Sequence, residues 1–205
     1  MSLLCLHTAD VHRATFDGLR DRITPGTPLQ HIVREDWLLR AQQGVDGLLK
    51  AEVTQAIHSA AGPVICTCTT LGEVAEDAGA IRIDRPMMRR AAEHFGDIML
   101  AYCLRSTERP SQTLLQQEMD DAGNPYAIAP LFLGHHWPLF EEGHPHAFAR
   151  SVALDIRNAV SQRAGIKAVV LAQASMAGAA MLLSDLPAPV LASPVLALKE
   201  GLAQL

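Results

Sequence analysis

The chain has 205 residues, of which 49% are hydrophobic and 19% charged, and its formal net charge is -5. This composition excludes a disordered chain, and the length suffices for one large or two small domains with their own cores. The acidic balance and the scattered arginines disfavour nucleic-acid binding. Because no apolar stretch reaches the roughly 20 residues of a membrane span and no signal peptide opens the chain, we predict no membrane association and a cytoplasmic location.

The first half alternates short apolar runs with amphipathic stretches, which predicts strands that alternate with helices. The predicted strands cover residues 3–7, 29–33, 64–68 and 81–84. The predicted helices run from residue 10 or 15 to 23 and over 35–41, 45–60 and 71–78, and another begins at Pro86. Proline is favoured in the first turn of a helix, which supports the last of these.

The second half follows the same order. Its predicted strands cover residues 98–103, 126–130, 168–173 and 190–192. Its predicted helices cover 106–122, 146–164 and 175–183, and a last one begins at 195. An irregular segment precedes the second of these helices. Strands that alternate with helices imply parallel sheets with both faces covered, so the fold class is α/β.

An internal repeat relates the two halves. The segment 64–72 (VICTCTTLG) recurs as 169–177 (VVLAQASMA), and the run 3–7 is matched to 99–103. At the equivalent position the first copy carries Cys68 and the second carries Gln173. We therefore predict two copies of one α/β unit, residues 1–95 and 96–193, with the C-terminal helix 194–205 packing back on the first.

Four side chains that can carry chemistry lie at the carboxyl ends of predicted strands. These are His7, Cys68, Cys103 and Gln173. Because ligands of open α/β sheets bind outside the carboxyl ends of the strands, the functional site is expected there.

Cys68 is the strongest candidate for a reactive group. It would face the N-terminus of the next helix, whose amides and dipole lower the pKa of a thiol from about 8.5 toward neutrality. Such a thiolate can act as a base or a nucleophile, and Thr69 and Thr70 would help to bind a carboxylate. The alternative is that Cys68 only packs in the core, the role that we assign to Cys66.

Two further residues have two interpretations each. His7 is placed opposite Cys103 in the repeat and is either the base or ion-pair partner of Cys68 or a satisfied polar residue under a loop. Cys103 is either a packed strand residue or a displaced second thiol.

The histidines of the irregular segment suggest a metal site at first sight. They are His135, His136, His144 and His146. Glycines and prolines make this segment rich in turns, so we interpret them as surface histidines and predict no metal. No glycine-rich phosphate loop occurs, and no cofactor is predicted.

The run Cys68-Thr69-Thr70-Leu71-Gly72, followed by residues 82–87 (RIDRPM), resembles the first active-site segment of the aspartate/glutamate racemase superfamily. This superfamily includes cofactor-independent racemases, maleate isomerases and arylmalonate decarboxylases. Ser106-Thr107 and residues 172–177 with Ser193-Pro194 resemble its second half, so the similarity covers essentially the whole chain.

The resemblance implies two pseudo-symmetric flavodoxin-like halves, each with a mostly four-stranded parallel sheet flanked by helices, and a homodimer. It implies a cofactor-independent enzyme that holds a small carboxylate between the halves and moves its α-proton with two cysteines, one from each half. The enediolate would be stabilised by Thr69, Thr70, Ser106, Thr107 and Ser175. Gln173 and Ala174 would also contact the substrate.

The sequence departs from this pattern at Gln173, which stands where the second cysteine is expected, because an amide cannot shuttle a proton. Several functions therefore stay open, and a racemase-like isomerase that uses the Cys68 thiolate comes first. Its partner could be Cys103 or His7, or the thiolate could add covalently in a cis-trans isomerisation. The alternatives are a single-cysteine decarboxylase of a malonate-type acid and a non-catalytic carboxylate-binding or regulatory protein.

Overall fold

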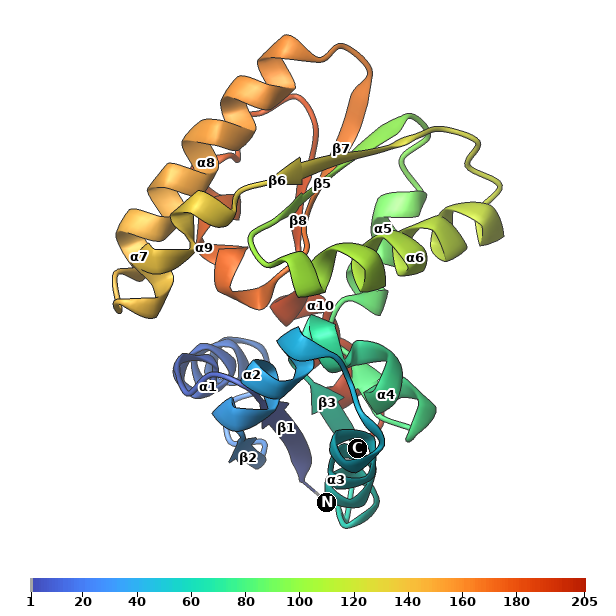
Figure 1. Cartoon of the computed structure of the whole chain (residues 1–205), viewed down its shortest axis with the longest axis vertical. Helices are drawn as coiled ribbons and strands as arrows, with labels where there is room; N and C mark the ends of the chain where they lie inside the picture. The colour runs from blue at the N-terminus through green and yellow to red at the C-terminus, as the bar shows by residue number, and fades with distance from the viewer. Residues whose placement is uncertain (1) are drawn as a thin grey trace. The chain divides into compact units, whose positions relative to one another are not determined.

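The structure is a computed structural model that describes residues 2–205 (Figure 1). Its strands form two four-stranded sheets in which every pairing between neighbours is parallel, and helices cover both faces of each sheet. The predicted α/β class with two flavodoxin-like halves is therefore confirmed. None of the described helices combines the length and the apolarity needed to cross a membrane.

The first unit comprises residues 2–84 and 194–205. Its sheet has the strand order β2-β1-β3-β4, with β1 (Leu3–His7), β2 (Leu29–Val33), β3 (Val64–Cys66) and β4 (Ile81–Arg82). Its helices are α1 (Val11–Ile23), α2 (Glu35–Gln43), α3 (Gly47–His58), the 3-10 helix η1 (Thr69–Leu71), α4 (Gly72–Asp77) and α10 (Ser193–Leu202).

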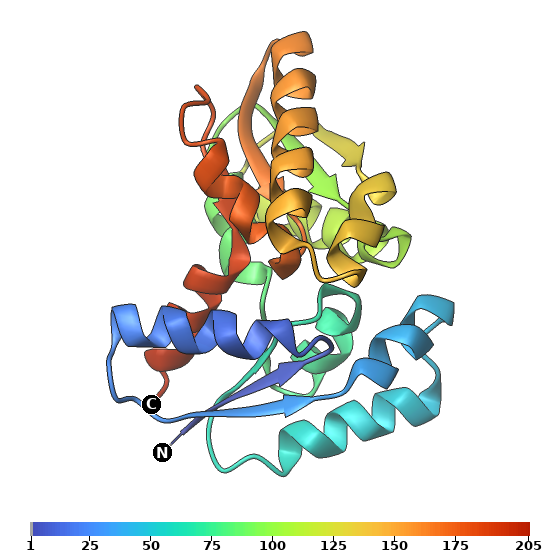
Figure 2. The same ribbon diagram turned by 90° about the vertical axis from the view of Figure 1, so that its left-hand side faces the viewer.

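Strand alternation decides which side chains of the first unit meet which helices. Leu4 and Leu6 of β1 pack with Val64 and Cys66 of β3 in one core, which α2, α3 and α4 cover. Leu3, Cys5 and His7 point to the opposite face, which α1 and α10 cover: Gly201 of α10 lies against Leu3, and Phe16 of α1 lies 5.6 Å from the His7 ring. Figure 2 shows α1 and α3 on opposite sides of this sheet.

The second unit comprises residues 85–193. Its sheet has the order β6-β5-β7-β8, with β5 (Asp97–Tyr102), β6 (Ile128–Phe132), β7 (Ile166–Leu171) and β8 (Val190–Ala192). Its helices are α5 (Arg85–Ala92), α6 (Arg105–Asp121), the 3-10 helix η2 (Gly134–His136), α7 (Trp137–Glu141), α8 (Pro145–Gln162), the 3-10 helix η3 (Ala174–Met176) and α9 (Ala177–Leu182). Met99 and Ala101 of β5 share a core with residues of α8 and α9, and α5 and α6 contact β7 and β5.

The division of the chain differs from the predicted one at α5. The sequence analysis placed residues 85–95 with the first half, but α5 contacts α6, β7 and β8 and is grouped with the second unit. The C-terminal helix α10 is grouped with the first unit. The last helix of each repeat therefore belongs to the unit that the other repeat builds.

A buried ion pair lies at the end of β4, close to Cys66. The Arg82 guanidinium bonds both carboxylate oxygens of Asp84, at 2.8 and 3.0 Å, and both side chains are buried. Arg82 also lies against Gly72 at the start of α4, where a Cβ would come within 2.9 Å of its Nε. Glycine at position 72 therefore lets the guanidinium pass next to the segment that carries Cys68.

Candidate active site

The register of the two sheets shows which residues are equivalent in the repeats. Leu6 pairs with Cys66 in the first sheet, and Ala101 pairs with Leu171 in the second. The hydrogen bonds one residue farther along β3 and β7 confirm this equivalence. The backbone N–H of Thr67 donates to the Leu6 carbonyl, and that of Ala172 donates to the Ala101 carbonyl, both at 2.9 Å.

Counting on from these pairs, Cys68 is equivalent to Gln173, as the sequence repeat predicted. Thr8, however, is the equivalent of Cys103. The sequence-based match of His7 to Cys103 was therefore wrong by one residue. In a strand a shift of one residue moves a side chain to the other face of the sheet, so this correction changes which groups can meet.

Four donors surround the Cys68 sulfur, which lies after the end of β3 and directly before η1. They are the Thr8 hydroxyl, the Leu71 backbone N–H, and the backbone N–H and hydroxyl of Thr70. All four favour the negatively charged thiolate and oppose the effect of burial on its pKa, because an N–H or O–H near the sulfur stabilises its negative charge. The Leu71 N–H also donates to the Cys68 carbonyl oxygen, at 3.2 Å. Thr70, which was expected near Cys68, thus lies next to its sulfur, and Thr8 contributes from the residue after β1.

Burial nevertheless outweighs these donors. Cys68 is only 6% exposed, and loss of water raises the pKa of its thiol above the ordinary value of 9.0. The sequence-based expectation of a pKa lowered toward neutrality was therefore wrong. At neutral pH the resting Cys68 is a protonated thiol, and its thiolate, once formed, is a strong base that the four donors stabilise.

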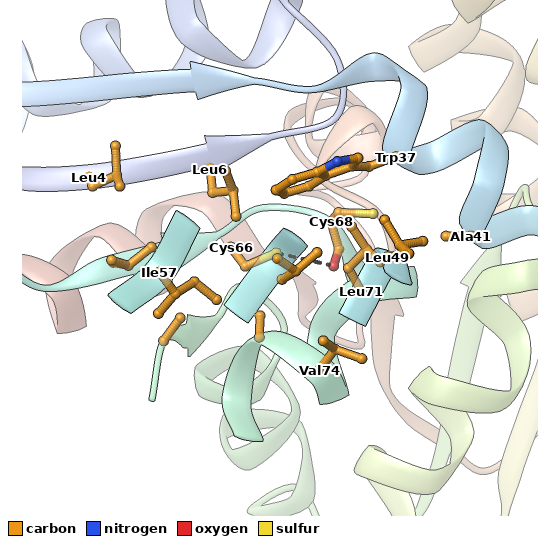
Figure 3. Close-up of a cluster of buried hydrophobic side chains, with 14 residues drawn as sticks. Leu4, Leu6, Trp37, Ala41, Leu49, Ile57, Cys66, Cys68, Leu71 and Val74 are labelled. Carbon is orange, nitrogen blue, oxygen red and sulfur yellow. Dashed lines mark hydrogen bonds between the residues drawn. The ribbon is translucent and has the colours of Figure 1, made fainter. Parts of the chain in front are cut away.

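Trp37 belongs to the same buried cluster as Cys68. Figure 3 shows its indole next to Cys68, with Leu49 and Leu71 in the same cluster. The indole N–H donates to Glu52 at 2.9 Å, and the Arg34 guanidinium lies 4.5 Å from the centre of the ring. This contact could not be predicted from the sequence, because Trp37 belongs to a helix, α2, that is far from the thiol in the chain.

His7 points away from Cys68, which fits the second of its two interpretations, a polar residue whose hydrogen bonds are satisfied. Its Nδ1 lies 2.9 Å from the Thr67 hydroxyl oxygen and its Nε2 lies 2.9 Å from Nδ1 of His31, on the face of the sheet that α1 covers. Burial first, and then the charges of His12, His31 and Arg13, lower the pKa of His7 to about 3. His7 is thus a neutral, buried group that holds Thr67 at the end of β3.

Gln173 makes its contacts inside the second unit. Its Oε1 accepts hydrogen bonds from the backbone N–H groups of Cys103, at 2.6 Å, and Leu104, at 3.1 Å. Leu104 is the N-cap residue of α6 and supplies no side-chain cap, so Gln173 satisfies the start of this helix instead. The predicted contact of Gln173 with a substrate carboxylate would use the amide Nε2, because a carboxylate oxygen accepts and does not donate.

Cys103 lies in the apolar core of the second unit with Met99 and Ala101, and burial raises the pKa of its thiol to about 12. No hydrogen bond contributes to that shift. Cys68 is therefore the better placed of the two thiols to carry a negative charge, and Cys103 is the better suited to stay protonated.

The other predicted site residues lie at the starts of the same helices. Thr69, Thr107 and Ala174 are buried. Ser106 lies in the first turn of α6, and Ser175 lies in η3. The Ser175 hydroxyl oxygen is buried and has no hydrogen-bond partner among the described residues, which leaves it free for another ligand.

Two groups of side chains have donor atoms close enough to share a metal ion. Cys5, His7 and His31 form one in the first unit, and His135, His136 and Asp155 form one in the second. The sequence analysis expected no metal site and did not consider Asp155, which lies on α8. His144 and His146 belong to neither group.

Comparison with known proteins adds the fold relationship. No protein-family model matches the sequence, and no curated protein matches it. Among solved structures, a glutamate racemase from Francisella tularensis in complex with D-glutamate superposes with a TM-score of 0.71 at 13% identity, over 98% of this chain and 80% of that one. The chain therefore has the fold of a glutamate racemase. An allantoin racemase from Klebsiella pneumoniae has the same fold, with a TM-score of 0.65, 16% identity and coverage of 99% and 86%. The predicted superfamily resemblance is thus confirmed at the level of fold.

Proposed function

We propose that the protein is a cofactor-independent, racemase-like isomerase of a small carboxylate, and that Cys68 removes the α-proton of the substrate. The observation that carries this proposal is the set of four hydrogen-bond donors around a sulfur at the carboxyl end of β3. A cysteine that only packs does not need such donors. The racemase fold supports the same class of reaction.

The resting Cys68 thiol first gives its proton to solvent, and the thiolate so formed then takes the α-proton. An S–H bond forms, the C–H bond breaks, and the electron pair moves into the carboxylate to give an enediolate. An α-proton next to a carboxylate is a very weak acid, so a thiolate of raised pKa is a better base for this step than a thiolate of low pKa. Thr69, Thr70, Ser106, Thr107 and Ser175 are the hydroxyl groups that we assign to the enediolate and carboxylate oxygens.

Racemisation also needs an acid that returns a proton to the opposite face of the α-carbon. We assign this step to Cys103, because burial keeps its thiol protonated. The register supports the choice, since Cys103 occupies the position in the second repeat that Thr8 occupies next to Cys68 in the first. In this proposal the second thiol comes from the end of β5 and not from Gln173 after β7, where it was expected. His7 is neutral and hydrogen-bonded through both ring nitrogens, so we assign it a positioning role.

The proposal can be tested by chiral chromatography. Single enantiomers of small amino and hydroxy acids are incubated with the protein and then analysed for the opposite enantiomer. The first compounds are D- and L-glutamate, because D-glutamate is bound in the Francisella structure. We expect interconversion of at least one pair, its loss in Cys68→Ser, and its retention in Cys66→Ser, which alters a neighbouring core thiol.

Three results would contradict the proposal. They are interconversion that survives Cys68→Ser, release of CO2 from a malonate-type acid without interconversion, and turnover of allantoin but of no carboxylate. Cys103→Ser tests the second assignment separately: it should abolish interconversion, whereas the exchange of the α-proton with solvent should remain.

A further inference from the structure

We propose that His135, His136 and Asp155 form a binding site for a divalent transition-metal ion, independent of the proposed isomerase site. Both imidazoles converge on one atom, because Nε2 of His135 lies 3.1 Å and Nε2 of His136 lies 2.9 Å from the same Asp155 oxygen, Oδ2. All three donor atoms lie within 4.8 Å of one another.

The local fold holds these residues together without help from their own hydrogen bonds. Gly134 begins η2, and the Phe132 ring lies close against its backbone, so a side chain at position 134 would displace this ring. Directly after the histidines, Trp137 and Phe140 of α7 pack against Phe148 of α8, with ring centroids 6.2 and 5.5 Å apart. This aromatic contact fastens η2 and α7 to the helix that carries Asp155.

The distances suit an ion of the zinc type. In a tetrahedral site with bonds of about 2.0–2.2 Å, neighbouring donor atoms lie about 3.3–3.6 Å apart. Each Nε2 need only move a few tenths of an ångström farther from the Asp155 Oδ2, from 3.1 and 2.9 Å, to admit the ion. Each imidazole would then carry its proton on Nδ1 and offer the lone pair of Nε2 to the metal, so no net proton loss is required from neutral rings.

The donor set selects the kind of metal. Two imidazole nitrogens and one carboxylate oxygen favour Zn²⁺, Co²⁺, Ni²⁺ or Cu²⁺ over Mg²⁺ and Ca²⁺, which prefer oxygen donors only. The side chains of His135, Asp155 and His136 are 63%, 33% and 16% exposed, so an ion can reach them from solvent without unfolding. Three protein ligands leave at least one position for water, as in open rather than closed zinc sites.

A bound ion would join η2 to α8 and stabilise the second unit, because a ligand that binds only the folded state raises its stability. The other interpretation is that Asp155 only accepts two hydrogen bonds. The Cys5, His7 and His31 group is a less suitable site, because it is buried and the pKa of the Cys5 thiol is raised to about 12, which opposes formation of the thiolate that a metal requires.

The test is a titration of the full-length protein, free of any purification tag, with Co²⁺, followed by visible absorption and by calorimetry, together with thermal unfolding in Zn²⁺. We expect one equivalent of Co²⁺ and an increase in Tm with Zn²⁺. His136→Ala and Asp155→Asn should weaken Co²⁺ binding at least tenfold and remove the Tm increase. Asp155→Asn keeps a hydrogen-bond acceptor of the same shape, so it should fold without the ion.

Two control variants make the result specific. His146→Ala changes an exposed histidine of the same region, and Cys5→Ala removes the thiol of the buried group; both should bind Co²⁺ like the wild type. Binding that is unchanged in both His136→Ala and Asp155→Asn, or that disappears in Cys5→Ala, would overturn the proposal. Neither result depends on whether the protein is an isomerase, since no activity is measured.

Discussion

The side-chain oxygen of Gln173 accepts a hydrogen bond of 2.6 Å from the backbone N–H of Cys103, across 70 positions of the chain. In the first unit the equivalent pair is Cys68 and Thr8, joined by a hydrogen bond from the Thr8 hydroxyl to the sulfur. The two repeats thus keep a contact between the ends of equivalent strands, but the residues differ. In the first unit the thiol follows β3, whereas in the second it follows β5.

The first prediction concerns this cap on α6. Gln173→Leu keeps much of the side chain's size but removes the acceptor for two backbone N–H groups, so it should lower the free energy of unfolding by about 1–2 kcal/mol. Urea unfolding followed by circular dichroism measures the loss. Gln173→Glu keeps the acceptor and places a negative charge at the helix N-terminus, and it should be clearly more stable than Gln173→Leu. Equal stability of the two variants would show that the cap contributes nothing.

The second prediction concerns the ionisation of Cys68. Because burial raises the pKa of this thiol above 9.0, alkylation by iodoacetamide should be slower at pH 7.5 than that of a free thiol, and its rate should increase as the pH rises above 9. Thr8→Val removes a hydrogen bond that lowers the pKa and should slow the reaction further, whereas Thr8→Ser should not. Peptide mass spectrometry separates Cys68 from the other three cysteines. Rapid labelling of Cys68 at neutral pH would contradict the raised pKa.

The third prediction concerns stability in acid. The pKa of His7 is about 3 in the folded protein and about 6.5 in the unfolded chain. Below pH 6.5 the unfolded chain therefore binds a proton on this histidine, whereas the folded protein binds it only at about pH 3. The stabilisation by neutral His7 is therefore complete above pH 6.5 and is lost as the pH falls through this window. Urea unfolding at pH 7.5 and 5.0 should show a smaller pH dependence in His7→Gln. The same substitution at the exposed His58 should leave the dependence as in the wild type, and an equal change in both variants would refute the assignment.

The fourth prediction concerns the ion pair at the end of β4. Asp84 is fully buried against the Arg82 guanidinium, and Glu76 lies farther from it, at 3.8 Å. Asp84→Asn therefore removes the closer carboxylate from a buried positive charge and should cost about 3 kcal/mol of stability. Asp185→Asn breaks the exposed pair with Arg157 and serves as the control, with no measurable change expected. Chemical unfolding of both variants tests the contrast, which fails if the two substitutions have similar effects.

Much of the fold could be predicted because the strand signals are local. The apolar runs at 3–7, 29–33 and 190–192 coincide with β1, β2 and β8. The runs at 64–68 and 168–173 were predicted to extend two residues too far, because their last residues leave the sheet to begin η1 and η3. The irregular histidine segment contains η2 and α7, which depend on aromatic packing against α8 that no local pattern reveals.

The candidate site was only partly predictable, for a reason of register. Cys68 and its threonines lie next to one another in the sequence, so their grouping was visible there. Thr8 could have been found by counting alternate residues from Leu6, which shares a face with Cys66. The contact between Trp37 and Cys68 and the bond from Gln173 to Cys103 depend on long-range packing, and the raised pKa of Cys68 follows from that packing.

The most direct test of the central claim, that Cys68 takes a proton from the α-carbon of a small carboxylate, is hydrogen exchange in D2O. Proton NMR would follow the α-proton signal of candidate acids, starting with glutamate, in the presence of wild-type protein, Cys68→Ser and Cys66→Ser. We predict that the signal of at least one acid disappears with the wild type and with Cys66→Ser, and that it persists with Cys68→Ser. Exchange that continues at the wild-type rate in Cys68→Ser would contradict the claim.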